Sequence, residues 1–120
     1  TTLGYLSWTV AQAASAPYAL GVASVLPCFQ IYAHVGANLL AQAHGLPNRH
    51  PYRQWIAAYE NPAFATATRT ALGILERACA AADTATVVAI RTTFVQGCRW
   101  ERRFWADAHA LAGWDSDLVA

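Results

Sequence analysis

The chain has 120 residues, with eight basic and seven acidic side chains and a net charge of +1. This length allows one domain at most, and so short a chain buries only about two-thirds of its unfolded surface when it folds alone. The basic residues are all arginines, scattered without interleaved aromatics, which argues against nucleic acid as a partner.

The segment at residues 2–15 predicts the first helix. Its apolar residues recur at steps of three or four, which is the spacing of one helix face, and Ala16-Pro17 ends the pattern. The members of this face are Leu3, Leu6, Val10 and Ala14.

A long second helix is predicted over residues 18–44, with a stop signal at Gly45 and Pro47. Pro27 kinks or restarts this helix, because proline cannot donate a hydrogen bond to the carbonyl of Ala23. The helix is apolar on both sides, which is typical of a central helix in a bundle. The rest of the chain supplies few helices, so we expect an N-terminal segment or a partner subunit to complete the packing.

The remainder of the chain predicts three more helices. They cover residues 51–59, residues 62 to about 82, and a stretch from Asp83 or Thr84 to about Ala112. Asn61 before Pro62 combines a helix cap with a favoured first position, and either Asp83 or Thr84 can cap the final helix. No stretch alternates long enough to predict a strand, so the fold class is all-α, as part of one domain over residues 1–120.

Residues 1–48 contain no charged side chain, so this part is either buried or embedded in lipid. The uncharged run at 16–33 reaches the lower limit of about 18 residues for spanning a bilayer. It contains two prolines, however, and no basic cluster flanks it, so we predict no membrane partner. Nothing at the N-terminus reads as a signal peptide. The odd number and wide spacing of Cys28, Cys79 and Cys98 favour reduced thiols and a cytoplasmic protein.

Cys28 is the first candidate for chemistry. It lies in the long apolar helix one turn before Tyr32, and side chains four apart share a helix face. If Pro27 starts a new helical segment, the unpaired amides and the positive end of the dipole favour the thiolate form of Cys28. The alternative is a small buried hydrophobe, which is the commonest fate of a free cysteine.

Glu101 is the second candidate, because it lies on the apolar side of the final helix. That side consists of Val87, Ile90, Phe94, Cys98, Glu101, Trp105 and Ala108. Arg103 and Asp107 lie off it and can pair one turn apart. A carboxyl group in apolar surroundings keeps its proton more readily than in water and can donate it near neutral pH. The alternative is that an arginine such as Arg53 or Arg91 neutralises Glu101 within the bundle.

The remaining candidates are weaker. His44 and His50 flank a short turn without a third ligand, so they indicate loop histidines and no metal site. Cys79 and Cys98 lie on core-facing helix sides, and Cys98 is the better placed to act near Glu101. The tryptophans expected to pack the bundle or a subunit interface are Trp8, Trp55 and Trp114.

Three blocks of sequence carry a family resemblance. They are PCFQIYAHVG at residues 27–36, HPYRQWIAAY at residues 50–59, and ERRFW at residues 101–105 with a trailing Gly113-Trp114. In content, order and separation they resemble the C-terminal half of the TenA (thiaminase II) family. The resemblance covers nearly the whole chain.

The resemblance implies a helical bundle similar to haem oxygenase, here only its C-terminal helices, usually assembled as a homotetramer. It implies hydrolysis of 4-amino-5-aminomethyl-2-methylpyrimidine to the hydroxymethyl pyrimidine in thiamin salvage, with thiamin cleavage as a related activity. By the same resemblance Cys28 is the nucleophile and Glu101 protonates the pyrimidine ring. The tyrosines expected around nucleophile and substrate are Tyr5, Tyr32 and Tyr59.

The implied chemistry suits these residue types. A thiolate can add to a carbon of an electron-poor pyrimidine while a carboxylic acid protonates the ring nitrogen that receives the electrons. The exocyclic methylene then expels its amine, water adds and the thiolate leaves, so no metal or organic cofactor is needed. We expect Phe29 and Trp105 to wall an apolar pocket that orients the flat ring and keeps Glu101 protonated between steps.

The chain departs from the family pattern in three respects. Gln30 stands where an aromatic residue is common, and His34 where an acidic residue is common. The family's aspartate that grips the amino group of the pyrimidine belongs to early helices that this chain does not contain. A non-catalytic helical module that binds a pyrimidine or a protein is therefore the alternative function, and a quinone-cofactor synthase on the same scaffold is a third.

Overall fold

The computed structural model describes residues 1–45, 47 and 49–113, and only the backbone of His44. These residues form five α-helices and two 3-10 helices, with no strand among them. The elements are α1 (Thr2–Ser15), α2 (Tyr18–Gln42), η1 (Ala43–Gly45), α3 (Arg53–Ala57), η2 (Ala58–Glu60), α4 (Pro62–Ala80) and α5 (Thr84–His109). The prediction of an all-α fold is confirmed.

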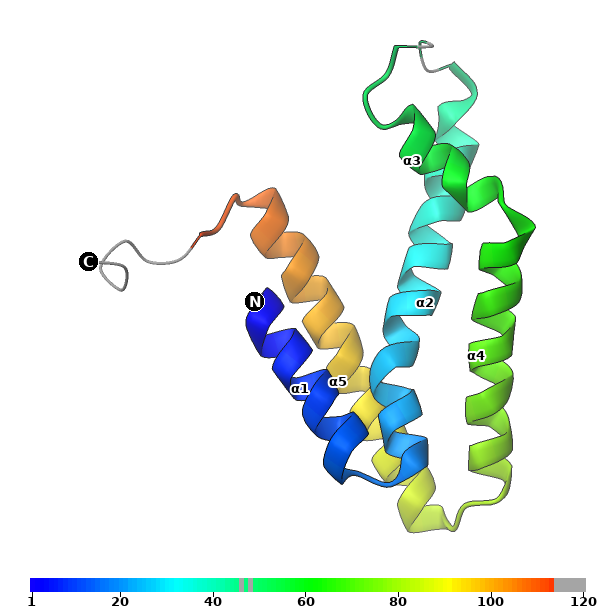
Figure 1. Ribbon diagram of the computed structural model, residues 1–120, viewed down its shortest axis with the longest axis vertical. Coiled ribbons are helices and arrows are strands. Elements are labelled where there is room, and N and C mark those ends of the chain that lie inside the picture. The colour runs from blue at the N-terminus through cyan, green and yellow to red at the C-terminus, as the bar shows by residue number, and fades with distance from the viewer. Residues whose placement is uncertain (46, 48, 114–120) are drawn as a thin grey trace.

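The central helix is α2, which packs against α1, α4 and α5. In Figure 1, α4 runs beside α2, while α1 lies next to α5 on the other side. The helices α2 and α5 meet near the N-terminal half of α2 and then diverge, so their C-terminal ends lie apart. The short elements α3 and η2 contact the far end of α2.

The helix α2 runs without a break through Pro27. Of the two alternatives left open for Pro27, a kink or a restart, the structure excludes the restart, and Pro27 lies inside one helix. Pro27 is fully buried, and tertiary packing of this kind supplies most of the stability of helices in proteins. Cys28 consequently lies in a helix interior and has no helix N-terminus beside it.

The helix ends follow the predicted caps. The side chain of Asn61 accepts a hydrogen bond of 2.9 Å from the amide of Ala63, and Asp83, rather than Thr84, caps α5. α5 ends at His109, a few residues earlier than predicted, because Leu111 adopts a left-handed backbone with φ of 53°. The amide of Ala112 then bonds the carbonyl of Asp107, which closes the helix in a Schellman-type turn.

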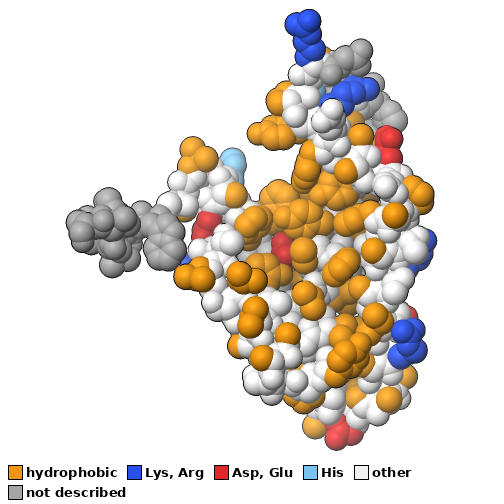
Figure 2. All heavy atoms as spheres, in the orientation of Figure 1, with side chains coloured by type: hydrophobic (Ala, Val, Ile, Leu, Met, Phe, Trp, Pro, Cys, Tyr) orange, Lys and Arg blue, Asp and Glu red, His pale blue; other side chains and the backbone are white. Residues whose placement is uncertain are grey.

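The hydrophobic core is thin. The buried core cluster consists of Ala23, Leu26, Leu75 and Ile90, and the molecule measures only 18 Å along its shortest axis. Because a helix with its side chains is about 10–12 Å wide, the fold is no more than two helices thick. Figure 2 shows hydrophobic side chains spread over the centre of one face. The chain thus leaves much apolar surface uncovered.

The apolar side of α1 faces solvent in this chain. Leu3, Leu6 and Val10 are 59%, 61% and 57% exposed. The helix α2 is long and apolar enough to cross a bilayer, a property that core helices of soluble proteins share. Here α2 packs against three helices and carries the buried Ala23, Ser24, Leu26, Pro27 and Gly36.

Candidate active site

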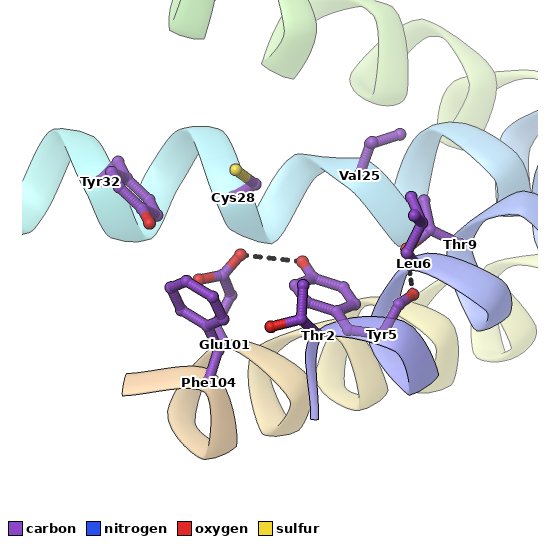
Figure 3. Close-up of a pocket in the computed structure, with 9 residues that line it drawn as sticks. All are labelled: Thr2, Tyr5, Leu6, Thr9, Val25, Cys28, Tyr32, Glu101 and Phe104. Atoms are coloured by element: carbon purple, nitrogen blue, oxygen red, sulfur yellow. Dashed lines mark hydrogen bonds between the residues drawn. The ribbon is translucent and has the colours of Figure 1, made fainter. Parts of the chain in front are cut away.

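A cavity of about 320 Å³ lies between α1, α2 and α5. Each helix supplies part of its wall, and Figure 3 shows Tyr5 of α1 and Glu101 of α5 meeting beside the stretch of α2 that carries Cys28 and Tyr32. The lining residues are Thr2, Tyr5, Leu6 and Thr9 from α1, Val25, Cys28 and Tyr32 from α2, and Glu101 and Phe104 from α5. The cavity therefore brings together four of the residues singled out in the sequence.

Glu101 is the buried acid of this cavity, with 2% of its surface exposed. Its Oε1 atom accepts a hydrogen bond of 2.8 Å from the hydroxyl of Tyr5. Its Oε2 atom is buried and has no hydrogen-bond partner among the described residues. Among the described residues Glu101 thus accepts a hydrogen bond from a tyrosine, where the sequence had proposed an arginine as the alternative partner. A buried carboxylate oxygen without a partner is costly, so Oε2 offers a strong acceptor to a bound molecule.

Cys28 lines the same cavity and is accessible to solvent. Burial of the thiol by the cavity walls raises its pKa, and the negative charge of Glu101 raises it further. The condition for a thiolate stabilised by a helix N-terminus, a helix start at Cys28, is therefore not met. Near neutral pH Cys28 carries its proton, and it needs a base to become a nucleophile.

Two tyrosines frame this pair from opposite sides. Tyr5 lies nearly parallel to Trp100, with ring centres 6.1 Å apart, and burial together with the bond to Glu101 raises the pKa of its phenol. Tyr32 packs on Trp105 at 5.4 Å between ring centres, and burial and the charge of Glu101 raise its pKa. Both phenols stay protonated and can donate hydrogen bonds.

Three other predicted site residues lie outside the cavity lining. The ring of Tyr59 packs against Gly36 and Phe64, and burial, followed by the charge of an ionised Cys28, raises the pKa of its phenol. Phe29 packs against the hydrophobic core, so the expectation that it walls the pocket is wrong. Trp105 lies behind Tyr32 and is not among the described residues that line the cavity. The side chains of a helix point about 100° apart, which sends Phe29 away from the face of Cys28.

Comparison with known proteins identifies the scaffold. The sequence model of the TENA/THI-4/PQQC family matches residues 2–110. The chain belongs to the TENA/THI-4/PQQC family. The family predicted from the three sequence blocks is therefore confirmed, together with its haem-oxygenase-like helical fold. No solved structure matches the chain.

Curated relatives within this family have names from thiamin metabolism. The chain is 34% identical over 113 residues to the thiamine biosynthesis multifunctional protein ThiED of Corynebacterium glutamicum, covering 94% of the chain and 14% of that protein. It is 32% identical over 114 residues to ThiED of Corynebacterium efficiens, covering 95% and 15%. It is 24% identical over 119 residues to the aminopyrimidine aminohydrolase of Bacillus subtilis, covering 99% and 49%. The chain thus spans half or less of the curated relatives it matches.

Several lining residues of this family member were not predicted. Phe104 lies three residues after Glu101 on the same side of α5, and that spacing could have identified it. Thr2, Leu6 and Thr9 share the side of α1 that carries Tyr5 and could have been found in the same way. Val25 lies one turn before Cys28.

No group of three histidine, cysteine or acidic residues that could hold a metal ion occurs in the described part of the chain. His34 pairs with Asn38 at 3.0 Å on an exposed side of α2. His50 lies in the loop before α3, as expected of a loop histidine. The side chain of His44, and Trp114 with its predicted packing role, lie outside the described residues.

Proposed function

We propose that this chain carries the nucleophile and the acid of an aminopyrimidine aminohydrolase that acts in thiamin salvage. The family and the names of its relatives support a role in thiamin metabolism. The observation that carries the proposal is the cavity in which Cys28 and the unpartnered Oε2 of Glu101 lie together. The specific reaction is hydrolysis of the aminomethyl pyrimidine to its hydroxymethyl product, with cleavage of thiamin as a related activity.

Cys28 and Glu101 can together carry out the proton transfers that this reaction requires. The Cys28 thiol must lose its proton as its sulfur bonds to a ring carbon, and the ring nitrogen that receives the electron pair must gain one. Glu101 can take the first proton and supply the second through Oε2. The exocyclic carbon then expels its amine, which leaves as ammonia with the proton that Glu101 takes back from the ring nitrogen. Water adds its hydroxyl group to that carbon, and Glu101 passes the proton of this water to the ring nitrogen. The thiolate leaves with the electrons of the carbon–sulfur bond, which restores the aromatic ring.

The other lining residues support this assignment of roles. Tyr5 holds Oε1 and leaves Oε2 free for the substrate. Phe104 provides an apolar wall for a flat ring, and the protonated Tyr32 can donate a hydrogen bond beside the nucleophile. None of these steps uses a cofactor.

The test is product formation by protein that includes the remaining length found in the aminohydrolase relative. Cys28→Ala and Glu101→Gln are each expected to abolish most turnover of the aminomethyl pyrimidine. Cys98→Ser is the matched control, because Cys98 is half-buried on α5 but does not line the cavity. Full activity of Cys28→Ala would reject the proposal.

A non-catalytic helical module that binds a pyrimidine or a protein is the second candidate. The observation that favours it is the open cavity, because the lining residues Leu6 and Val25 are 61% and 42% exposed. Ligand binding without product, together with slow alkylation of Cys28 that the ligand does not change, would support this function over the hydrolase.

The uncovered apolar surface supports a larger assembly. We place this chain in a cytoplasmic homo-oligomer, a tetramer by family resemblance, whose packing is completed by an N-terminal segment and by neighbouring subunits. Covering the exposed side of α1 would also close the mouth of the cavity at Leu6 and exclude water from the cavity.

A further inference from the structure

A close approach between α2 and α5 lies directly beside the candidate catalytic pair. The buried residues of α5 are Ile90, Thr93, Gly97 and Glu101, so Gly97 lies one turn before Glu101 on the face that meets α2. Facing Gly97 on α2 are Ser24 and Pro27, and Pro27 is followed at once by Cys28.

There is no room for a side chain at this crossing. A β-carbon on Gly97 would lie 2.7 Å from Cγ of Pro27 and 3.2 Å from the carbonyl oxygen of Ser24. Ordinary contacts between carbon atoms are about 3.5–4.0 Å, so the two helices would have to separate by about 1 Å. Neither neighbour is the free end of a flexible side chain, because Pro27 is a buried ring closed onto the backbone and Ser24 presents a backbone atom.

We propose that Gly97 is a positioning residue, whose missing side chain lets α5 approach α2 closely enough to hold Glu101 beside Cys28. The effect of Gly97 on catalysis rests on the proposed function, while its effect on the distance between α2 and α5 does not. Gly97 and Glu101 are four residues apart, about 6 Å along the helix, so a displacement at Gly97 is carried to Glu101. A misplacement of about 1 Å between reacting groups can cost about 100-fold in rate.

The pH dependence of Cys28 alkylation tests this geometry without any substrate. Iodoacetamide labelling of the 120-residue chain is followed by peptide mass spectrometry across a pH series. The titratable groups around the thiol are Glu101 from α5, Tyr5 from α1, Tyr32 from α2 and Tyr59 from η2. Burial and Glu101 raise the pKa of Cys28. Moving α5 outward admits water to the thiol and weakens the effect of the Glu101 charge on it, so both changes lower the labelling midpoint.

The deciding variant is Gly97→Ala, with Gly73→Ala as its matched control. Gly73 lies inside α4, and a β-carbon there meets only the end of the Arg77 side chain at 3.5 Å. We expect the labelling midpoint of Cys28 to fall in Gly97→Ala and to stay at the wild-type pH in Gly73→Ala. An unchanged midpoint in folded Gly97→Ala overturns the proposal.

A second substitution tests whether the contact with Pro27 is the cause. Pro27→Ala removes Cγ but keeps Cβ, which lies at an ordinary 3.5 Å from the added carbon. In the double variant Gly97→Ala/Pro27→Ala only the 3.2 Å contact with the carbonyl oxygen of Ser24 remains, so its midpoint should move back toward that of Pro27→Ala alone. If Gly97→Ala does not fold, recovery of folding and midpoint in the double variant supports the proposal, and failure to recover both overturns it.

Activity provides a separate readout. In protein that turns over the aminomethyl pyrimidine, Gly97→Ala should lower kcat by about 10- to 100-fold with little change in KM, because the cavity walls remain. The double variant should restore most of kcat. Wild-type protein without turnover rejects the hydrolase function, while the labelling series still decides the role of Gly97.

Discussion

At the residue scale, one hydrogen bond gives the two oxygens of the Glu101 carboxylate different roles. Tyr5 donates to Oε1 at 2.8 Å, and Oε2 is buried without a hydrogen-bond partner in the described part of the chain. Trp100 stacks on Tyr5 and holds the phenol in place. A carboxylate fixed through one oxygen presents the other in a defined direction, which is what proton exchange with a ring nitrogen or a thiol requires.

Loss of this bond is expected to destabilise the fold. Tyr5→Phe removes the donor and leaves both oxygens of Glu101 buried and unsatisfied, which costs about 1–3 kcal/mol of unfolding free energy. Urea denaturation at neutral pH measures this cost. Tyr18→Phe is the control, because Tyr18 is 73% exposed. Equal stability of both variants would contradict a structural role for the bond.

The titrating groups around the cavity predict a loss of stability in alkaline solution. Burial raises the pKa of Cys28, Cys98 and Tyr5, and the charge of Glu101 adds to each shift. A folded chain with raised pKa values holds protons that the unfolded chain releases, so its stability is complete below the ordinary thiol pKa of about 8.5 and falls above it. Urea midpoints measured between about pH 7.5 and 10 should decline. A slope unchanged by Cys28→Ala and Cys98→Ala would show that the thiols play no part.

Spacing along single helices predicted part of this site correctly. Cys28 and Tyr32 share one side of α2, and Glu101 is buried on α5. Phe29 was misplaced, because residues one apart on a helix point in different directions and the sequence does not say which direction faces a partner. The bond between Tyr5 and Glu101 joins residues 96 positions apart, and no local pattern specifies such a contact.

At the scale of elements, periodicity and caps located the helices well. The first helix has the predicted bounds, and Asn61 and Asp83 cap as expected. The buried line of α5 differs by one position from the predicted side, because Thr93 and Gly97 are buried where Phe94 and Cys98 were expected. The pattern of hydrophobic residues does not reveal this buried face of α5, because the residue at its crossing with α2 is the glycine Gly97.

A second close contact, between Gly36 of α2 and Tyr59 of η2, holds η2 against α2. A β-carbon on Gly36 would lie 2.3 Å from Cδ1 and 2.4 Å from Cγ of Tyr59. Gly36→Ala is therefore expected to displace Tyr59, at a cost of about 1–3 kcal/mol for overpacking. Hydrogen exchange should become faster over residues 53–60, as judged by mass spectrometry. Protection equal to that of wild type would show that Tyr59 repacks without cost.

At the scale of the whole molecule, the described chain lacks the layers that a bundle needs. Its shortest axis is 18 Å, and α2 keeps exposed side chains although it is apolar on both sides. The sequence already indicated that further helices must pack on α2. The chain spans 49% of the length of the aminopyrimidine aminohydrolase relative. The substrate contacts that such a cover would add cannot be derived from these residues.

The exposed side of α1 predicts self-association of the isolated chain. Leu3, Leu6 and Val10 form an uncharged stripe that is more than half exposed, and contiguous apolar surface of this kind marks interaction sites. We expect the 120-residue chain to form oligomers whose mass rises with concentration in size-exclusion chromatography with light scattering. Leu3→Glu/Val10→Glu should shift the population to monomer, because buried charges at a contact oppose association. Val88→Glu, at a 60% exposed position on α5, is the control and should leave the mass distribution unchanged. If the wild-type chain stays monomeric, or if both variants change the mass distribution equally, α1 is not the contact surface.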